Sequence, residues 1–108
     1  MFPSKITFVD SDSSPAVHEE IEAHLAKLEE QFERITSAEV MVRIPHKRHN
    51  RKYFHIHIRL DIPGKQIVVT RETEADDAHM DIHRALHDAF QKVERQLSTH
   101  IRKRAQFA

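Results

Sequence analysis

The 108-residue chain contains no cysteine and no tryptophan, a single glycine, a single tyrosine and four prolines. The absence of cysteine excludes disulfides, thiolate catalysis and cysteine-based zinc sites. With one glycine the chain has no glycine-rich phosphate-binding loop. No apolar run approaches the roughly 20 residues that a membrane helix requires, and the N-terminal MFPSKITFVD has no apolar signal-peptide core. We therefore expect one cytoplasmic domain over residues 1–108, large enough for a single core.

The net charge is zero, with 17 Lys and Arg against 17 Asp and Glu, but the charges are segregated along the chain. Residues 10–33 contain eight acids and one cation, and residues 34–71 contain nine cations and two acids. The pattern then repeats, with six acids and one cation in residues 72–88 and five cations and one acid in residues 89–108. This segregation predicts a folded protein with one basic and one acidic surface.

The first half of the chain predicts a strand and a helix. Apolar residues alternate over residues 6–9, before a turn-forming run of Asp and Ser at residues 10–14. Ser14 and Pro15 mark a helix start, because the Ser hydroxyl can accept from a free backbone N–H and Pro suits the first helical position. Apolar residues follow at helical spacing, at Val17, Ile21, Leu25, Leu28, Phe32 and Ile35, which predicts an amphipathic helix.

The second half predicts three strands and a long helix. The apolar period is two over residues 39–44, where Pro45 ends the strand, and again over residues 53–62. Pro63 and Gly64 predict a hairpin turn into a strand over residues 66–70, and residues 73–77 are acidic and typical of a turn. Apolar residues then recur at helical spacing, at Ala78, Ile82, Ala85, Leu86, Ala89, Phe90, Val93, Leu97 and Ile101.

The order β-α-β-β-β-α predicts an α+β fold of two layers: a four-stranded mixed sheet with two helices packed on one face. The first two strands are expected to be parallel, joined by a right-handed helical crossover, and the other pairs to be antiparallel hairpins. Because the helices cover one face, the other remains in water. On that open face we expect the alternate residues of the 53–62 strand, Tyr53, His55, His57, Arg59 and Asp61.

The open face and the segment before it predict binding to a polyanion such as RNA. Arg43, His55, His57 and Arg59 are expected on the open face, and the loop that follows Pro45 carries Lys47, Arg48, Arg51 and Lys52 with no apolar residue. Cations that neutralise phosphates release condensed counterions, which adds salt-sensitive affinity without base reading.

Three segments of the chain are similar to a known family: ITFVDSDSSPAVHEEIEAHLAKLEEQFERIT, YFHIHIRLDIPGKQIVVTRE and DIHRALHDAFQKVERQLSTHIRKR. Within them, AKLE at residues 26–29, D-x-x-x-A at residues 81–85 and K-x-E-R-Q-L at residues 92–97 occur in the family's order. The chain thus resembles the ribosome hibernation-promoting factor and ribosome-associated inhibitor family, in its short, single-domain form, over nearly its whole length.

The resemblance implies the same β-α-β-β-β-α order and a monomer that binds the small ribosomal subunit. It implies that this protein occupies the channel for mRNA and tRNA and silences idle ribosomes, as in stress or stationary phase. By the same resemblance, Lys27, Lys92 and Arg95 face ribosomal RNA, and Arg102, Lys103 and Arg104 continue that basic surface.

The ten histidines admit two interpretations. His79, His83 and His87 recur every four residues and could hold Zn or Ni with Asp81 or Asp88, and His55 and His57 could clamp a metal on the sheet. Alternatively they are polar surface residues near RNA, whose charge rises at low pH, so that binding tightens as the pH falls from about 7.5 to about 6. We favour the second interpretation and expect no metal and no cofactor.

Catalysis is not expected, since the sequence has no nucleophile elbow and no carboxylate in a context that suggests a pocket. Two alternatives to ribosome silencing remain. One is a domain that binds structured RNA in general, and the other is a histidine-rich metal-binding protein.

Overall fold

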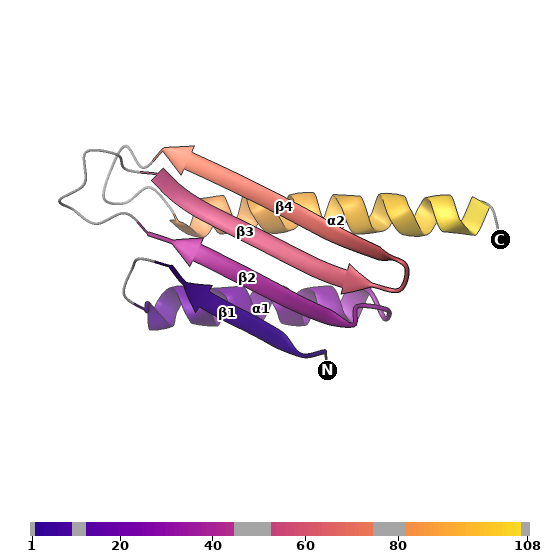
Figure 1. The fold of residues 1–108 in the computed structure, drawn as a ribbon, viewed down its shortest axis with the longest axis horizontal. Helices are drawn as coiled ribbons and strands as arrows, with labels where there is room; N and C mark the ends of the chain where they lie inside the picture. Colours follow the sequence, from indigo (N-terminus) through magenta and orange to yellow (C-terminus); the bar gives the residue numbers. More distant parts are fainter. Residues whose placement is uncertain (1, 10–12, 45–52, 75–81, 107–108) are drawn as a thin grey trace.

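The computed structural model describes residues 2–9, 13–44, 53–74 and 82–106. Four strands form one sheet in the order β1-β2-β3-β4, and two helices lie side by side behind it (Figure 1). The elements are β1 (Ser4–Phe8), α1 (Pro15–Gln31), β2 (Ser37–Arg43), β3 (Tyr53–Ile62), β4 (Lys65–Glu74) and α2 (Ile82–Gln106). β1 and β2 are parallel, and the β2–β3 and β3–β4 pairs are antiparallel. The predicted α+β architecture and element order are confirmed.

The core lies between the sheet and the helices. Alternate strand residues point into it, including Val40, Val42, Ile56, Ile58, Leu60, Ile67 and Val69, all at most 2% exposed. Ile21 and Leu25 of α1 and Leu86, Val93 and Leu97 of α2 close it from the other side. Each such side chain contributes about 1.5–3 kcal/mol of hydrophobic free energy, so the layered arrangement follows from the two apolar periods of the sequence.

α1 begins where the sequence predicts and ends earlier. The Ser14 hydroxyl accepts a 3.3 Å hydrogen bond from the backbone N–H of Val17, and Pro15 occupies the first turn. The helical period of the sequence continues to Ile35, but Phe32 is already extended, with φ −132° and ψ 110°. Ile35 is buried all the same, in the connection that leads to β2. The apolar spacing therefore identified the core residues correctly, but the helix that it predicted is longer than α1.

β4 is longer than expected. The predicted strand over residues 66–70 runs to Glu74 in the structure, and Thr73 and Glu74, expected in an acidic turn, pair with Phe54 and Tyr53 of β3. A ladder along the whole of β3 outweighs the weak strand preference of acidic residues, which is a small and context-dependent term. Residues 75–77 and Ala78 lie outside the described residues, and the described helix begins at Ile82.

The turn between β3 and β4 is formed by Pro63 and Gly64, as predicted. Gly64 has φ +79°, in the left-handed region that side chains with a Cβ rarely adopt. Within the described part of the chain, neither helix is long and apolar enough to cross a bilayer.

Candidate nucleic-acid interface

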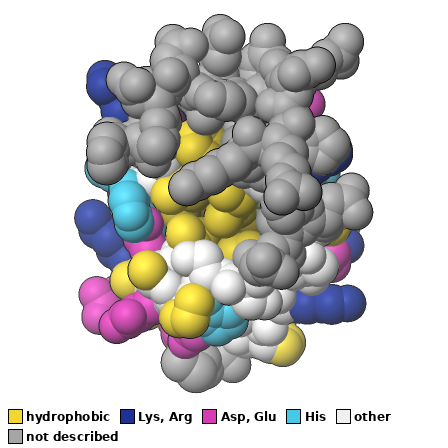
Figure 2. All heavy atoms as spheres, turned by 90° about the vertical axis from the view of Figure 1, so that its left-hand side faces the viewer, with side chains coloured by type: hydrophobic (Ala, Val, Ile, Leu, Met, Phe, Trp, Pro, Cys, Tyr) yellow, Lys and Arg dark blue, Asp and Glu magenta, His cyan; other side chains and the backbone are white. Residues whose placement is uncertain are grey.

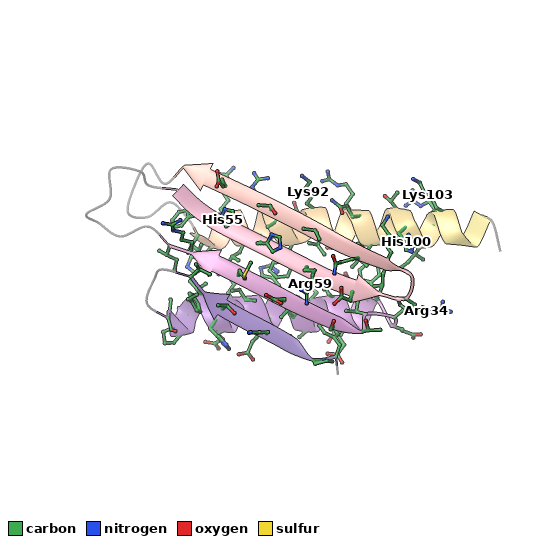
Figure 3. All side chains as sticks on the ribbon, viewed as in Figure 1. Arg34, His55, Arg59, Lys92, His100 and Lys103 are labelled. Atoms are coloured by element: carbon green, nitrogen blue, oxygen red, sulfur yellow. The ribbon has the colours of Figure 1, made fainter. Side chains whose placement is uncertain are left out.

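One side of α2 carries a row of exposed cations, here called the cationic stripe, formed by Arg84, Lys92, Arg95, Arg102 and Lys103. Their spacings of eight, three, seven and one residues keep them on one side of a helix with 3.6 residues per turn. Lys92 and Lys103 project from the margin of α2 that lies away from α1 (Figure 3). From Arg84 to Lys103 the stripe extends about 28 Å at 1.5 Å per residue, long enough to follow several phosphates.

An acid of α2 that lies among the stripe cations is paired with a cation of β4. Asp88 lies between Arg84 and Lys92, and its Oδ2 is 3.4 Å from Nη2 of Arg71 on β4. Arg71 therefore neutralises Asp88 and adds a guanidinium beside the stripe. Arg84 and Arg71 were not among the candidates that the sequence predicted. For Arg84 a signal existed, since it precedes Lys92 by eight residues, slightly more than two helical turns.

The open face of the sheet is mixed in charge. By the strand registers its described residues include the cations Lys5, Arg43 and Arg59 and the acids Glu39, Asp61 and Glu72. Arg59 Nη2 lies 3.3 Å from Glu39 Oε2, and Arg59 Nε lies 3.6 Å from Asp61 Oδ2. The sequence indicated a basic face because the alternation within β3 does not show which acids of β2 and β4 stand beside it.

Asp61 has a structural role on this face. It accepts hydrogen bonds from the Ser37 hydroxyl at 2.6 Å and from the Gln66 amide at 2.9 Å. These two bonds lower the pKa of the Asp61 carboxyl, and the charge of Arg59 lowers it further. The carboxylate thus joins β2, β3 and β4 at the hairpin end of the sheet.

The two histidines of β3 lie on the open face as expected (Figure 3 labels His55). His55 Nδ1 is 3.2 Å from Glu72 Oε1, and His57 Nδ1 is 2.9 Å from the Thr70 hydroxyl. Each imidazole thus has a partner on β4, and only His55 has an acidic one.

Three further histidines, His24, His83 and His87, lie between the helices. His83 of α2 hydrogen-bonds to Glu20 of α1. The His24 ring stacks on Phe90, with centroids 4.6 Å apart and planes 7° apart, and lies 6.3 Å from the His87 ring. Burial lowers the pKa of His24, His87 and Lys27 lower it further, and Glu20 opposes the effect. Among the described residues no three His, Asp or Glu side chains are arranged to hold a metal ion.

Lys27 is exposed on α1 and lines the same region between the helices. Lys27 lies apart from the cationic stripe. The described members of the stripe all belong to the margin of α2 that lies away from α1. The other exposed charged residues of α1 include the acids Glu19, Glu22 and Glu30. The helix layer thus has an acidic margin on α1 and a basic margin on α2.

Several candidates lie outside the described residues: Lys47, Arg48, Arg51 and Lys52, together with His79 of the proposed metal stripe. Arg104 belongs to α2, but its side chain and that of Tyr53 are not described. Figure 2 views the end of the molecule where β2 and β4 finish and both helices begin. Apolar side chains are visible at its centre, with described cations, acids and histidines at its margins.

Comparison with models of known protein families shows the family to which the chain is related. The model of the family described as sigma 54 modulation protein / S30EA ribosomal protein matches residues 4–105. The chain belongs to this family. The resemblance to hibernation-promoting factors seen in the sequence is thereby confirmed.

Two solved structures share the fold. A ribosomal subunit interface protein from Coxiella burnetii is 20% identical, with a TM-score of 0.73, and the match covers 92% of this chain and 97% of that one. The N-terminal domain of Protein Y from Thermus thermophilus is 23% identical, with a TM-score of 0.70, over 93% of this chain and 99% of that one. None of the curated proteins matches the chain.

Proposed function

We propose that the chain is a non-enzymatic factor that binds the small ribosomal subunit in the channel for mRNA and tRNA and thereby silences idle ribosomes. Membership in a family described as S30EA ribosomal protein supports association with the ribosome. A related fold in a ribosomal subunit interface protein agrees with it. The protein acts as a monomer in this proposal.

The observation that carries the proposal is the cationic stripe of α2. Its five cations are exposed along one helix margin, and the acid between them, Asp88, is paired with Arg71. Structured RNA is recognised mainly through its shape and its phosphates. A rigid helix anchored on a sheet holds the backbone of these residues at fixed positions, so only their side chains, and not the backbone, must be ordered when phosphates bind.

The open face of the sheet contributes less to this interface. Arg59 already lies beside two carboxylates, and the acids of three strands stand among the cations. A phosphate that approached this face would meet both signs of charge. We therefore place the main RNA contact on the α2 margin and a secondary one on His55, His57 and Arg43.

The test is cosedimentation of the purified protein with small ribosomal subunits, with and without mRNA and initiator tRNA as competitors. Occupation of the channel requires that the protein be lost from the subunits when the competitors are added. Binding that persists under competition would instead favour general affinity for structured RNA and would contradict the channel site. An added control is the variant that lacks Lys92 and Arg95, which should sediment less with the subunits in either case.

A further inference from the structure

An open groove runs between α1 and α2, in the helix layer of the molecule (Figure 1 shows the two helices). Its lining includes His24, Lys27 and Gln31 from α1 and His87, Phe90 and Gln91 from α2. The groove therefore combines aromatic rings, amides and a cation within one concave surface. None of these residues except Lys27 entered the RNA interface considered above.

The aromatic part of the groove is a stack of two rings. His24 lies parallel to Phe90, at 7° and 4.6 Å between centroids, and the half-buried His24 lines the groove that a ligand would enter. Burial favours the neutral imidazole. A neutral flat ring that is held by a second ring is the kind of platform on which a nucleic-acid base stacks.

The polar part of the groove can bind the edges of a base. Gln31 and Gln91 each present two amide donors and one acceptor, and Glu94 adds a carboxylate that can accept from an exocyclic amino group. Within the described residues, no side-chain hydrogen bond occupies Gln31, Gln91 or Glu94. These groups are exposed or partly exposed and face a groove, so a ligand can use them without breaking a bond of the fold.

The charge around the groove favours the base inside and the phosphate outside. Lys27 provides the cation for a phosphate, while Glu94 and Glu20 repel one from the floor near His24. The two carboxylates therefore disfavour a free anion inside the groove. An uncharged base fits the groove better, with its phosphate next to Lys27.

We propose that the groove between α1 and α2 binds a single unstacked base of the RNA strand that the protein contacts. The proposal rests on the proposed function, because it deepens how the same protein grips RNA. It assigns His24 as the stacking platform, Gln91 and Gln31 as the groups that bind the base edge, and Lys27 as the contact to the adjoining phosphate.

The experiment uses a short single-stranded oligoribonucleotide that carries one 2-aminopurine, whose emission falls when the base stacks on a ring. The chain contains no tryptophan, so no tryptophan emission interferes. We expect saturable quenching by the wild-type protein. Gln91→Ala should weaken binding about two- to tenfold, as for a lost hydrogen bond, and His24→Leu at least about fivefold, as for a lost base stack. Gln96→Ala, in a glutamine of the same helix that does not line the groove, should bind as the wild type does.

A second oligoribonucleotide, with an abasic site in place of the 2-aminopurine, retains the phosphates and lacks the base. Weaker binding of the abasic strand supports the proposal. Equal binding of both strands, or Gln91→Ala binding as tightly as Gln96→Ala, overturns it. Gln91 is exposed, so this variant remains informative if His24→Leu fails to fold. Cosedimentation of the wild-type protein with small subunits is measured in parallel, so the groove can fail while the proposed function holds, and the reverse.

Discussion

Arg71 on β4 and Asp88 on α2 form an ion pair at 3.4 Å that links the sheet to the helix bearing the cationic stripe. Both side chains are partly exposed, 42% and 36%, so the pair contributes about 0–1 kcal/mol to the free energy of unfolding. Its larger effect concerns the surface charge. The pair removes the negative charge that would otherwise interrupt the cations of α2.

Asp88→Asn should therefore tighten binding to small subunits by about threefold at low salt, since one unit charge a few ångströms away is worth roughly 1 kcal/mol or less in water. Urea denaturation should show little loss of stability. Glu22→Gln removes an exposed acid from α1, away from both the α2 margin and the open face of the sheet, and is the matched control, with no expected gain. Equal affinity of Asp88→Asn and wild type would mean that RNA does not approach the α2 margin.

The salt dependence of binding reports how many stripe cations contact phosphates. Each phosphate contact contributes roughly 0.7–0.9 to the slope of log affinity against log salt. The Lys92→Gln, Arg95→Gln variant should make that slope shallower by about 1.5. Lys5→Gln, on β1 at the opposite edge of the sheet, should leave the slope at its wild-type value. Affinities over a salt series measure both, and equal slopes for the two variants would remove the stripe from the interface.

The fold was largely predictable because each element carries a clear apolar period. The alternation along β3 indicated which of its residues face the core, and the burial of Ile56, Ile58 and Leu60 confirms it. The ends of elements were less predictable. α1 stops at Gln31 because Phe32 turns extended while still packing against the core, and a period of apolar residues cannot show such a change of backbone.

The site was less predictable than the fold, since it depends on neighbours that are distant in the sequence. Arg59 seemed free in β3 alone, but strand pairing places Glu39 of β2 beside it. His24 and Phe90 are far apart in the chain, and only the packing of α1 on α2 forms their stack. The apolar period of a helix or strand shows which of its own side chains share a face. Strand register and helix packing decide which residues of other elements lie opposite that face.

Gly64 offers a test of the hairpin turn. Its φ of +79° is unfavourable for residues with a Cβ, and apart from its two chain neighbours no residue comes within 4 Å of where a Cβ would be, so the cost of a substitution is one of backbone conformation alone. Gly64→Ala should lower the free energy of unfolding by about 1–2 kcal/mol. Gly64→Asn should lose less, because Asn tolerates this conformation better. Chemical denaturation of both variants measures the difference, and equal stability of Ala and Gly at this position would contradict the turn geometry.

His24 should make stability depend on pH. Burial lowers its pKa, with His87 and Lys27 acting in the same direction and Glu20 against it. The folded protein therefore binds this proton less readily than the unfolded chain does. Its contribution to stability is complete above the ordinary pKa of about 6.5 and is lost as the pH falls below that value.

Comparing free energies of unfolding at about pH 7.5 and about pH 5.5 measures this effect. His24→Leu should show a smaller loss between the two than the wild-type protein. Gln31→Leu changes a neutral residue that lines the same groove and should keep the wild-type loss. If His24→Leu loses as much free energy of unfolding as the wild type does between the two pH values, groups other than His24 cause the pH dependence.

The histidines of β3 should make RNA binding depend on pH in the opposite direction. Protonation adds positive charge to the open face, so affinity for small subunits should rise by about two- to fivefold as the pH falls from about 7.5 to about 6.

The two histidines have different partners on β4. His55 has the Glu72 carboxylate as its partner and His57 the neutral Thr70 hydroxyl, but protonation adds one unit of positive charge at either ring. His55→Ala and His57→Ala should therefore each remove part of the pH dependence, and the double variant most of it. His18→Ala, which changes an exposed histidine on the acidic side of α1, should keep the wild-type response. If the double variant tightens with falling pH as much as the wild type does, His55 and His57 do not contact RNA.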